Sequence, residues 1–325
     1  MFKHRVFFVI AFAFALAFAD VFMPTVDIAR QASSAHAENS QVAVVRTGVY
    51  TYKGQGTVNT HWIETPGGGL VVIDVQRDLV HAREALAAVR AVGKPVRAIL
   101  ITHGHPDHYT GLGIFKQAFP DAVVYASAVT ENTIRTDSYG YNAAEQKDAP
   151  EITPREFAVP GRILEGDVTL TIDGLVLIAR EMGRAEANSV TAYYAPASRD
   201  LYVGDLVMNR VHAFMGEGAT GEWLAALDRV DAMFPNARVV HPGHGDSGAK
   251  QQLLTDQREY LRTVRGFAAE EIARSGFTAA AKTATARRIN ERFRYINPTG
   301  NADIVALGVD GLFQEFSRPT LTPIP

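Results

Sequence analysis

The sequence contains no cysteine among its 325 residues. This absence excludes disulfide bonds, and it excludes any metal site that depends on thiolate ligands. The chain also lacks a strong excess of one charge, because 32 basic and 35 acidic residues give a formal net charge of −3. Apart from the Ala-rich stretch 278–286, which is a strong helix former, no repeat or low-complexity segment occurs. The composition is that of a mixed globular chain whose metal ligands, if any, are imidazoles and carboxylates.

One apolar run stands at the start of the chain, Val6–Ala19, and it is too short to span a bilayer comfortably. It follows the basic residues Lys3 and Arg5, and small residues at Ala35 and Ala37 fit a signal peptidase site. We therefore expect a signal peptide at residues 1–37 and a periplasmic or secreted protein, with an uncleaved anchor as the alternative. Its removal leaves 29 basic and 33 acidic residues, a net charge of −4. We expect no nucleic-acid partner and, after cleavage, no membrane contact.

Three of the ten histidines and one aspartate lie within six positions, directly after the apolar run 96–101. In an extended segment residues two apart point to the same side, so His103 and His105 can offer imidazoles to one cation. Pro106 forces a turn that directs Asp107 and His108 towards a second cation. A solvated histidine-rich loop is the competing interpretation, but this density of donors at the end of a strand favours a metal site.

The motif His-x-His-x-Asp-His resembles the signature of the metallo-β-lactamase superfamily of two-metal hydrolases. The segments 202–205, which ends in Gly-Asp, and 240–245, which contains His-Pro-Gly-His, resemble the later ligand motifs of that family, so the resemblance covers roughly residues 42–248. It implies that His103 and His105 bind the first metal. It further implies a second metal bound by Asp107, His108 and His244, with Asp205 bridging both.

Hydrophobic periodicity predicts an α/β chain. We expect strands at 42–45, 49–52, 61–64, 70–73, 96–101, 122–126, 168–172, 176–180, 190–194, 201–203 and 238–241, and helices at 79–92, 112–119, 222–234, 256–275, 279–293 and 302–316. The stretch 138–160 is expected to be a loop, either facing substrate or inert. With the resemblance, this predicts an αββα metallo-β-lactamase-like sandwich at 38–250 and a C-terminal helical extension at 251–325. The extension would stabilise the sandwich, cap the substrate cleft or form a homodimer interface.

The family most often has Gly-His-Thr for the last ligand of the first metal, but no histidine occurs between His108 and His212. Two alignments compete, and they put either Glu186 or Arg184 at the ligand position. Chemistry favours Glu186, because an arginine remains protonated beside a dication whereas a glutamate oxygen can bind it. Glu181 is a weaker candidate, and a first site without this ligand is the remaining alternative.

Four other positions have less certain roles. Asp74 ends its strand near the same edge of the sheet and is expected to hydrogen-bond a ligand imidazole. His61 and Trp62 are predicted to be packing residues, and His241 a structural histidine at a strand end. His212 either faces substrate or lies on the surface.

Two cations held about 3.5–4 Å apart lower the pKa of a water between them and polarise an electrophile. Asp107 is the expected catalytic residue, which would orient that water and accept its proton. The sequence therefore predicts an exported hydrolase acting on a small-molecule ester, lactone or β-lactam. A catalytically weak metal- or ligand-binding protein and a thioesterase or sulfatase are the alternatives. We expect zinc, two ions per chain, although the extra carboxylate also suits manganese or iron.

Overall fold

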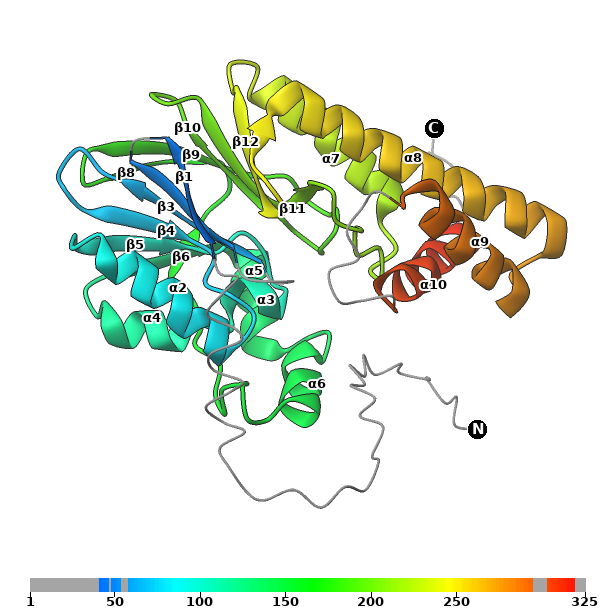
Figure 1. The fold of residues 1–325 in the computed structure, drawn as a ribbon, viewed down its shortest axis with the longest axis horizontal. Coiled ribbons are helices and arrows are strands. Elements are labelled where there is room, and N and C mark those ends of the chain that lie inside the picture. Colours follow the sequence, from blue (N-terminus) through cyan, green and yellow to red (C-terminus); the bar gives the residue numbers. More distant parts are fainter. Residues whose placement is uncertain (1–40, 47, 54–57, 295–302, 319–325) are drawn as a thin grey trace.

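The computed structural model describes residues 41–46, 48–53, 58–294 and 303–318. Two β-sheets pack face to face, and helices cover the outer face of each sheet (Figure 1). The predicted αββα sandwich and its C-terminal helices are confirmed, while the predicted signal peptide lies outside the described residues. Within the described ranges, no helix has both the length and the apolar character needed to cross a membrane.

The first sheet holds seven strands in sequence order and the second holds six in the order β13-β12-β11-β10-β9-β8. The first sheet comprises β1 (Gln41–Arg46), β2 (Val49–Lys53), β3 (Asn59–Glu64), β4 (Leu70–Ile73), β5 (Val96–Leu100), β6 (Val123–Ser127) and β7 (Arg162–Leu164). The second comprises β8 (Val168–Ile172), β9 (Leu175–Glu181), β10 (Thr191–Ala195), β11 (Asp200–Met208), β12 (Val239–His244) and β13 (Gly248–Ala249). The helices are α2 (Leu79–Ala91), α3 (Pro106–Tyr109), α4 (Leu112–Ala118), α5 (Ala128–Thr136), α6 (Tyr141–Asp148), α7 (Thr220–Met233), α8 (Lys250–Ser275), α9 (Ala279–Arg292) and α10 (Asp303–Ser317).

The interface between the sheets is an apolar layer built by alternation along the strands. On β9, Leu175, Leu177 and Ala179 are buried and point to the first sheet, whose Val71 and Leu100 belong to the same cluster. Strands β10 and β11 are buried on both faces because α7 and α8 cover their outer side. Helices α2 and α4 bury the outer face of the first sheet in the same way.

The stretch 138–160 is not a continuous loop, because it contains α6, and α5 lies just before it. Helix α6 begins after Gly140, whose φ of 72° turns the chain, and the Asp137 carboxylate accepts hydrogen bonds from the backbone N–H groups of Asn142 and Ala143. Only Asn142 of α6 is buried, so the helix has no apolar period that sequence analysis could detect. Local capping, not hydrophobic patterning, forms this helix.

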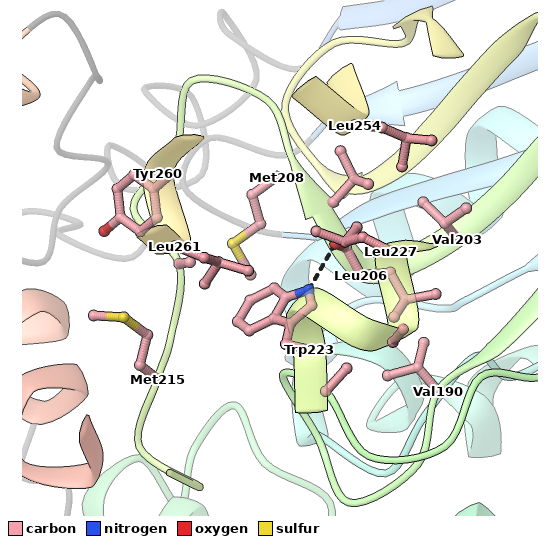
Figure 2. Close-up of a cluster of buried hydrophobic side chains, with 14 of the residues drawn as sticks. Val190, Val203, Leu206, Met208, Met215, Trp223, Leu227, Leu254, Tyr260 and Leu261 are labelled. Carbon is pink, nitrogen blue, oxygen red and sulfur yellow. Dashed lines mark hydrogen bonds between the residues drawn. The ribbon is translucent and has the colours of Figure 1, made fainter. Parts of the chain in front are cut away.

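The C-terminal helices share a hydrophobic core with the second sheet. Figure 2 shows the indole of Trp223 on α7 among Leu206 of β11 and Leu261 of α8, with its N–H donating to the Leu206 carbonyl at 2.8 Å. Helices α9 and α10 add further buried residues, including Ile289 and Leu312, to this cluster. The predicted helix starting at 256 begins earlier, at Lys250, so α8 runs along the sheet from its first turn.

Replacement of Trp223 tests how much this core contributes. Trp223 is fully buried, and Trp223→Phe removes packing volume and leaves the Leu206 carbonyl without its donor. We expect the free energy of unfolding to fall by about 2–4 kcal/mol. Met233→Ala, on the exposed end of the same helix, should change it by less than about 1 kcal/mol. Urea unfolding followed by circular dichroism measures both, and equal effects of the two substitutions would contradict this account.

Candidate metal centre

The predicted ligands come from both sheets and meet where strands end. The chain after β5 carries the four residues of the histidine motif, while β11 and the end of β12 supply Asp205 and His244. Glu186 lies on the connection between β9 and β10. The two sheets are joined beside the site, because Thr191 N donates to Thr102 O at 2.8 Å and a single bridge pairs His103 with Val190.

A first cluster is formed by His103, His105 and Glu186, all buried. Glu186 Oε2 lies 2.9 Å from His105 Nδ1 and 3.4 Å from His103 Nε2. One potential ligand atom from each residue lies within 4.8 Å of those of the others. This arrangement suits a single cation bound by two imidazoles and one carboxylate.

A second cluster is formed by Asp107, His108, Asp205 and His244. Asp205 Oδ1 lies 3.4 Å from His108 Nε2, and its Oδ2 lies 3.4 Å from His244 Nε2. Asp107 Oδ2 is 3.2 Å from the same nitrogen of His244. The rings of His103 and His108 have centroids 3.9 Å apart, so the two clusters adjoin.

Several atoms of the two clusters are buried without a hydrogen-bond partner. They are His103 Nε2, His108 Nε2, Glu186 Oε2 and Asp205 Oδ1, the same atoms that face one another across each cluster. Buried polar atoms without partners cost free energy, and such groups in a folded protein call for an explanation. A divalent cation in each cluster would satisfy all four atoms, and the donor set of imidazoles and carboxylates fits zinc.

Burial and neighbouring charges shift the pKa values of several side chains in the two clusters. Burial opposes protonation of His244, yet Asp205 and Asp107 raise its pKa to about 10. Burial raises the pKa of Glu186 to about 7, and burial lowers the pKa of His103 well below its usual range. Since ligands bind metal in their deprotonated form, cation binding at neutral pH releases protons from this centre.

In each cluster, one imidazole also contacts a carboxylate that lies outside that cluster. Asp74 Oδ2 accepts from His108 Nδ1 at 2.8 Å, and the same side chain accepts from the backbone N–H and the hydroxyl of Thr102. This is the geometry expected for Asp74. Glu217, on the connection between β11 and α7, lies 3.0 Å from His105 Nε2 through its Oε1. The sequence gives no signal for Glu217, because it lies 112 positions from His105 and belongs to no motif.

Gly243 makes the close approach of β12 to Asp205 and His108 possible. A Cβ atom added to Gly243, just before His244, would overlap with Asp205 Oδ1 and lie 3.0 Å from His108 Cε1. Only glycine leaves room for the second cluster at this position.

The structure brings together all seven predicted metal-site residues and separates the competing candidates from them. Glu181 accepts a hydrogen bond from the Ser189 hydroxyl instead of joining the first cluster. Arg184 donates to the Glu217 carbonyl at 2.7 Å, so its guanidinium points to the chain that follows β11. Metal binding by the seven clustered residues remains a prediction.

Three other histidines that the sequence analysis considered lie outside both clusters. His61 is buried, with Nε2 3.0 Å from the Pro242 carbonyl and Nδ1 2.8 Å from the Thr51 hydroxyl. His241 is also buried and lies 2.8 Å from the Ser247 hydroxyl through Nδ1. His212 is neither on the surface nor in a ligand cluster, because it packs beside Tyr260 with its Nδ1 3.1 Å from the phenol oxygen.

The fold and the paired clusters are those of an αββα protein with a candidate two-metal centre. Comparison with known families gives a match to the metallo-beta-lactamase superfamily over residues 54–244, more than half of the chain. The chain therefore belongs to the metallo-β-lactamase superfamily.

Individual relatives are distant. The chain is 24% identical over 217 residues to the metallo-beta-lactamase type 2 of Bacteroides fragilis, an alignment that covers 63% of this chain and 79% of that protein. It is 25% identical to a linear primary-alkylsulfatase of a Pseudomonas species and 24% identical to a hydroxyacylglutathione hydrolase of Thermosynechococcus vestitus. These alignments cover 62% and 50% of this chain but only 44% and 55% of the two relatives. A metallo-beta-lactamase from Pontibacter korlensis has the same fold, with a TM-score of 0.55, 24% identity, and coverage of 69% of this chain and 99% of that one.

The role of Glu186 can be tested by counting bound metal. Glu186→Ala removes the carboxylate that faces both histidines of the first cluster, so zinc stoichiometry should fall from two towards one. Glu186→His should restore it with a changed metal preference. Glu181→Ala is the matched control, because Glu181 lies outside the cluster and should leave two zinc ions bound. Elemental analysis after dialysis gives the count, and two tightly bound ions in Glu186→Ala would refute the assignment.

Proposed function

We propose that this protein is an exported metal-dependent hydrolase that cleaves a small-molecule ester, lactone or β-lactam. The observation that carries the proposal is the pair of adjoining clusters whose facing ligand atoms are buried and without hydrogen-bond partners. Membership of the superfamily supports a hydrolase. The name of one relative specifies β-lactams as its substrates, and the name of another specifies alkyl sulfates.

His103, His105 and Glu186 would hold one zinc ion, and Asp107, His108, Asp205 and His244 would hold the other. When bound, such ions lower the pKa of water and polarise the bond to be cleaved. Asp107 and His244 keep 18% and 15% of their side chains exposed, more than any other of the seven, so substrate and water reach the centre from their side.

Asp107 would orient the attacking water as a hydrogen-bond acceptor, and its role in accepting the proton is tested by substitution below. Burial opposes its ionisation, but His108 and His244 hold the pKa of its carboxyl well below its usual range. The carboxylate is therefore charged at neutral pH and available as a hydrogen-bond acceptor.

Aromatic side chains border the first cluster. The His105 ring makes edge-to-face contacts with Tyr141, at 5.2 Å between centroids, and with Phe214, at 5.7 Å. Tyr139 stacks on Tyr141 and is 42% exposed. These rings form an apolar wall that supports a substrate with a hydrophobic or aryl group.

A substrate panel tests the proposed activity. The zinc-loaded protein should hydrolyse at least one of a chromogenic cephalosporin, a lactone and an aryl ester. The panel also contains a thioester and an alkyl sulfate. Turnover of only one of these two would assign the protein to that reaction class. Two bound zinc ions with no turnover on the whole panel would favour a binding protein instead.

Asp107→Asn separates catalysis from metal binding. The amide cannot accept the proton, so kcat should fall by about 10²–10⁴-fold while at least one zinc ion stays bound. His103→Ala should by contrast remove the first metal and nearly all activity. Kinetics and elemental analysis on the same preparations distinguish the two effects, and full activity of Asp107→Asn with normal metal content would exclude this role.

Export is proposed from the N-terminal sequence alone. Cleavage after Ala37 would give a mature protein that starts at Glu38. N-terminal sequencing of protein recovered from its native host checks this. A chain that still carries Met1 in the exported fraction would indicate an anchor.

A further inference from the structure

Glu217 approaches His105 from the side opposite to the first cluster. The Nδ1 atom of His105 faces Glu186, whereas its Nε2 lies 3.0 Å from Glu217 Oε1. With one ring nitrogen directed into the cluster, the other is a donor that needs an acceptor. Glu217 supplies it from a side chain that is only 3% exposed.

The Glu217 carboxylate also lies near Tyr139, whose pKa is raised by burial and by this carboxylate. Its Oε2 is buried and has no hydrogen-bond partner of good geometry. Asp74, which backs His108 in the other cluster, divides its oxygens between that imidazole and Thr102. A buried carboxylate with one oxygen unsatisfied is costly, and this one is kept in contact with an imidazole of the first cluster.

Helix α10, near the C-terminal end of the chain, contacts the backbone around Glu217. A Cβ atom added to Gly311 of α10 would overlap with the carbonyl oxygens of Met215 and Gly216, the two residues before Glu217. On its other side, Gly218 has a φ of 61° and its carbonyl accepts from Arg318 Nη1 at 2.9 Å. Helix α10 therefore packs directly on the backbone that presents Glu217.

A second contact fixes the segment that follows. The Glu315 carboxylate of α10 accepts from the backbone N–H groups of Thr220 and Gly221 at 2.7 and 3.0 Å, at the start of α7. Backbone on both sides of Glu217 is thus tied to α10, and the side chain has little freedom to leave His105.

We propose that Glu217 is a positioning residue that orients His105 for the first metal, and that α10 acts on the metal centre through Glu217. This inference rests on the proposed metal binding by His103, His105 and Glu186, and it adds a link from the C-terminal helices to that site. Carboxylates behind a ligand imidazole fix the ring and increase its basicity, and their loss typically lowers metal affinity 10–100-fold.

The first test measures zinc affinity by competition with a chromophoric chelator. Glu217→Ala should weaken the first site about 10–100-fold and leave the second site unchanged. Glu217→Gln, which keeps an acceptor but loses the charge, should recover part of the loss. Glu291→Gln is the matched control, because Glu291 is an exposed glutamate of α9 that pairs with Arg287 and should change nothing. The visible spectrum of the cobalt-substituted protein should change in Glu217→Ala and not in the control.

The second test asks whether α10 acts through Glu217. Gly311→Ala should weaken the first site in the parent but add little in the Glu217→Ala background. If Gly311→Ala does not fold, Arg318→Gln replaces it, since it removes only the bond to the Gly218 carbonyl. Additive losses in the double variant would overturn the link to α10.

The outcomes separate this inference from the proposed function. First-site affinity within twofold of the parent in Glu217→Ala overturns the positioning role and leaves the metal centre intact. A parent protein that binds no zinc or cobalt overturns both. Weakened zinc binding without hydrolysis of any panel substrate supports the positioning role and contradicts only the proposed activity.

Discussion

The candidate metal centre depends on a division of its predicted ligands between two sheets. The first sheet supplies His103, His105, Asp107 and His108, and the second supplies Glu186, Asp205 and His244. Neither set completes a cluster by itself, so the sandwich must be closed for either site to form. The bond from Thr191 N to Thr102 O and that from the Tyr193 hydroxyl to Ile101 O fix this closure beside the ligands. The packing that stabilises the interface between the sheets therefore also brings the residues of each cluster together.

Closure concentrates charged side chains where most of them are removed from water. Glu186 and Asp205 are almost completely buried, and removal of ionised groups from water is costly unless they are paired. Asp205 and Asp107 raise the pKa of His244, so a protonated His244 offsets part of this cost. Two dications would do so more completely, and the partnerless atoms of each cluster face the positions where they would bind.

Sequence analysis predicted the parts of the structure that have a local signal. The ligands of the histidine motif follow from their spacing, and Glu186 follows from the chemistry of a site that lacks a histidine. Most strands follow from apolar runs, and β4 and β8 were predicted with the observed bounds. Helix α5 buries Thr130, Thr133 and Ile134, a mostly polar face that the apolar pattern does not reveal, and α6 buries only Asn142. Ser127 and Asp137 cap these two helices. Glu217 could not be predicted, because its place beside His105 arises only when distant connections meet in the folded chain.

The helices beyond the sandwich belong to the same physical unit as the site. Trp223 bonds to the carbonyl of Leu206, the residue after the ligand Asp205, and it packs in the cluster that α8, α9 and α10 complete. A displacement of these helices would therefore be transmitted to β11 through the shared core. It would also be transmitted to His105 through Glu217. Because packed cores transmit displacement with little compression, the C-terminal helices constrain one ligand in each cluster. A contribution of this kind follows from packing and requires no contact between these helices and substrate.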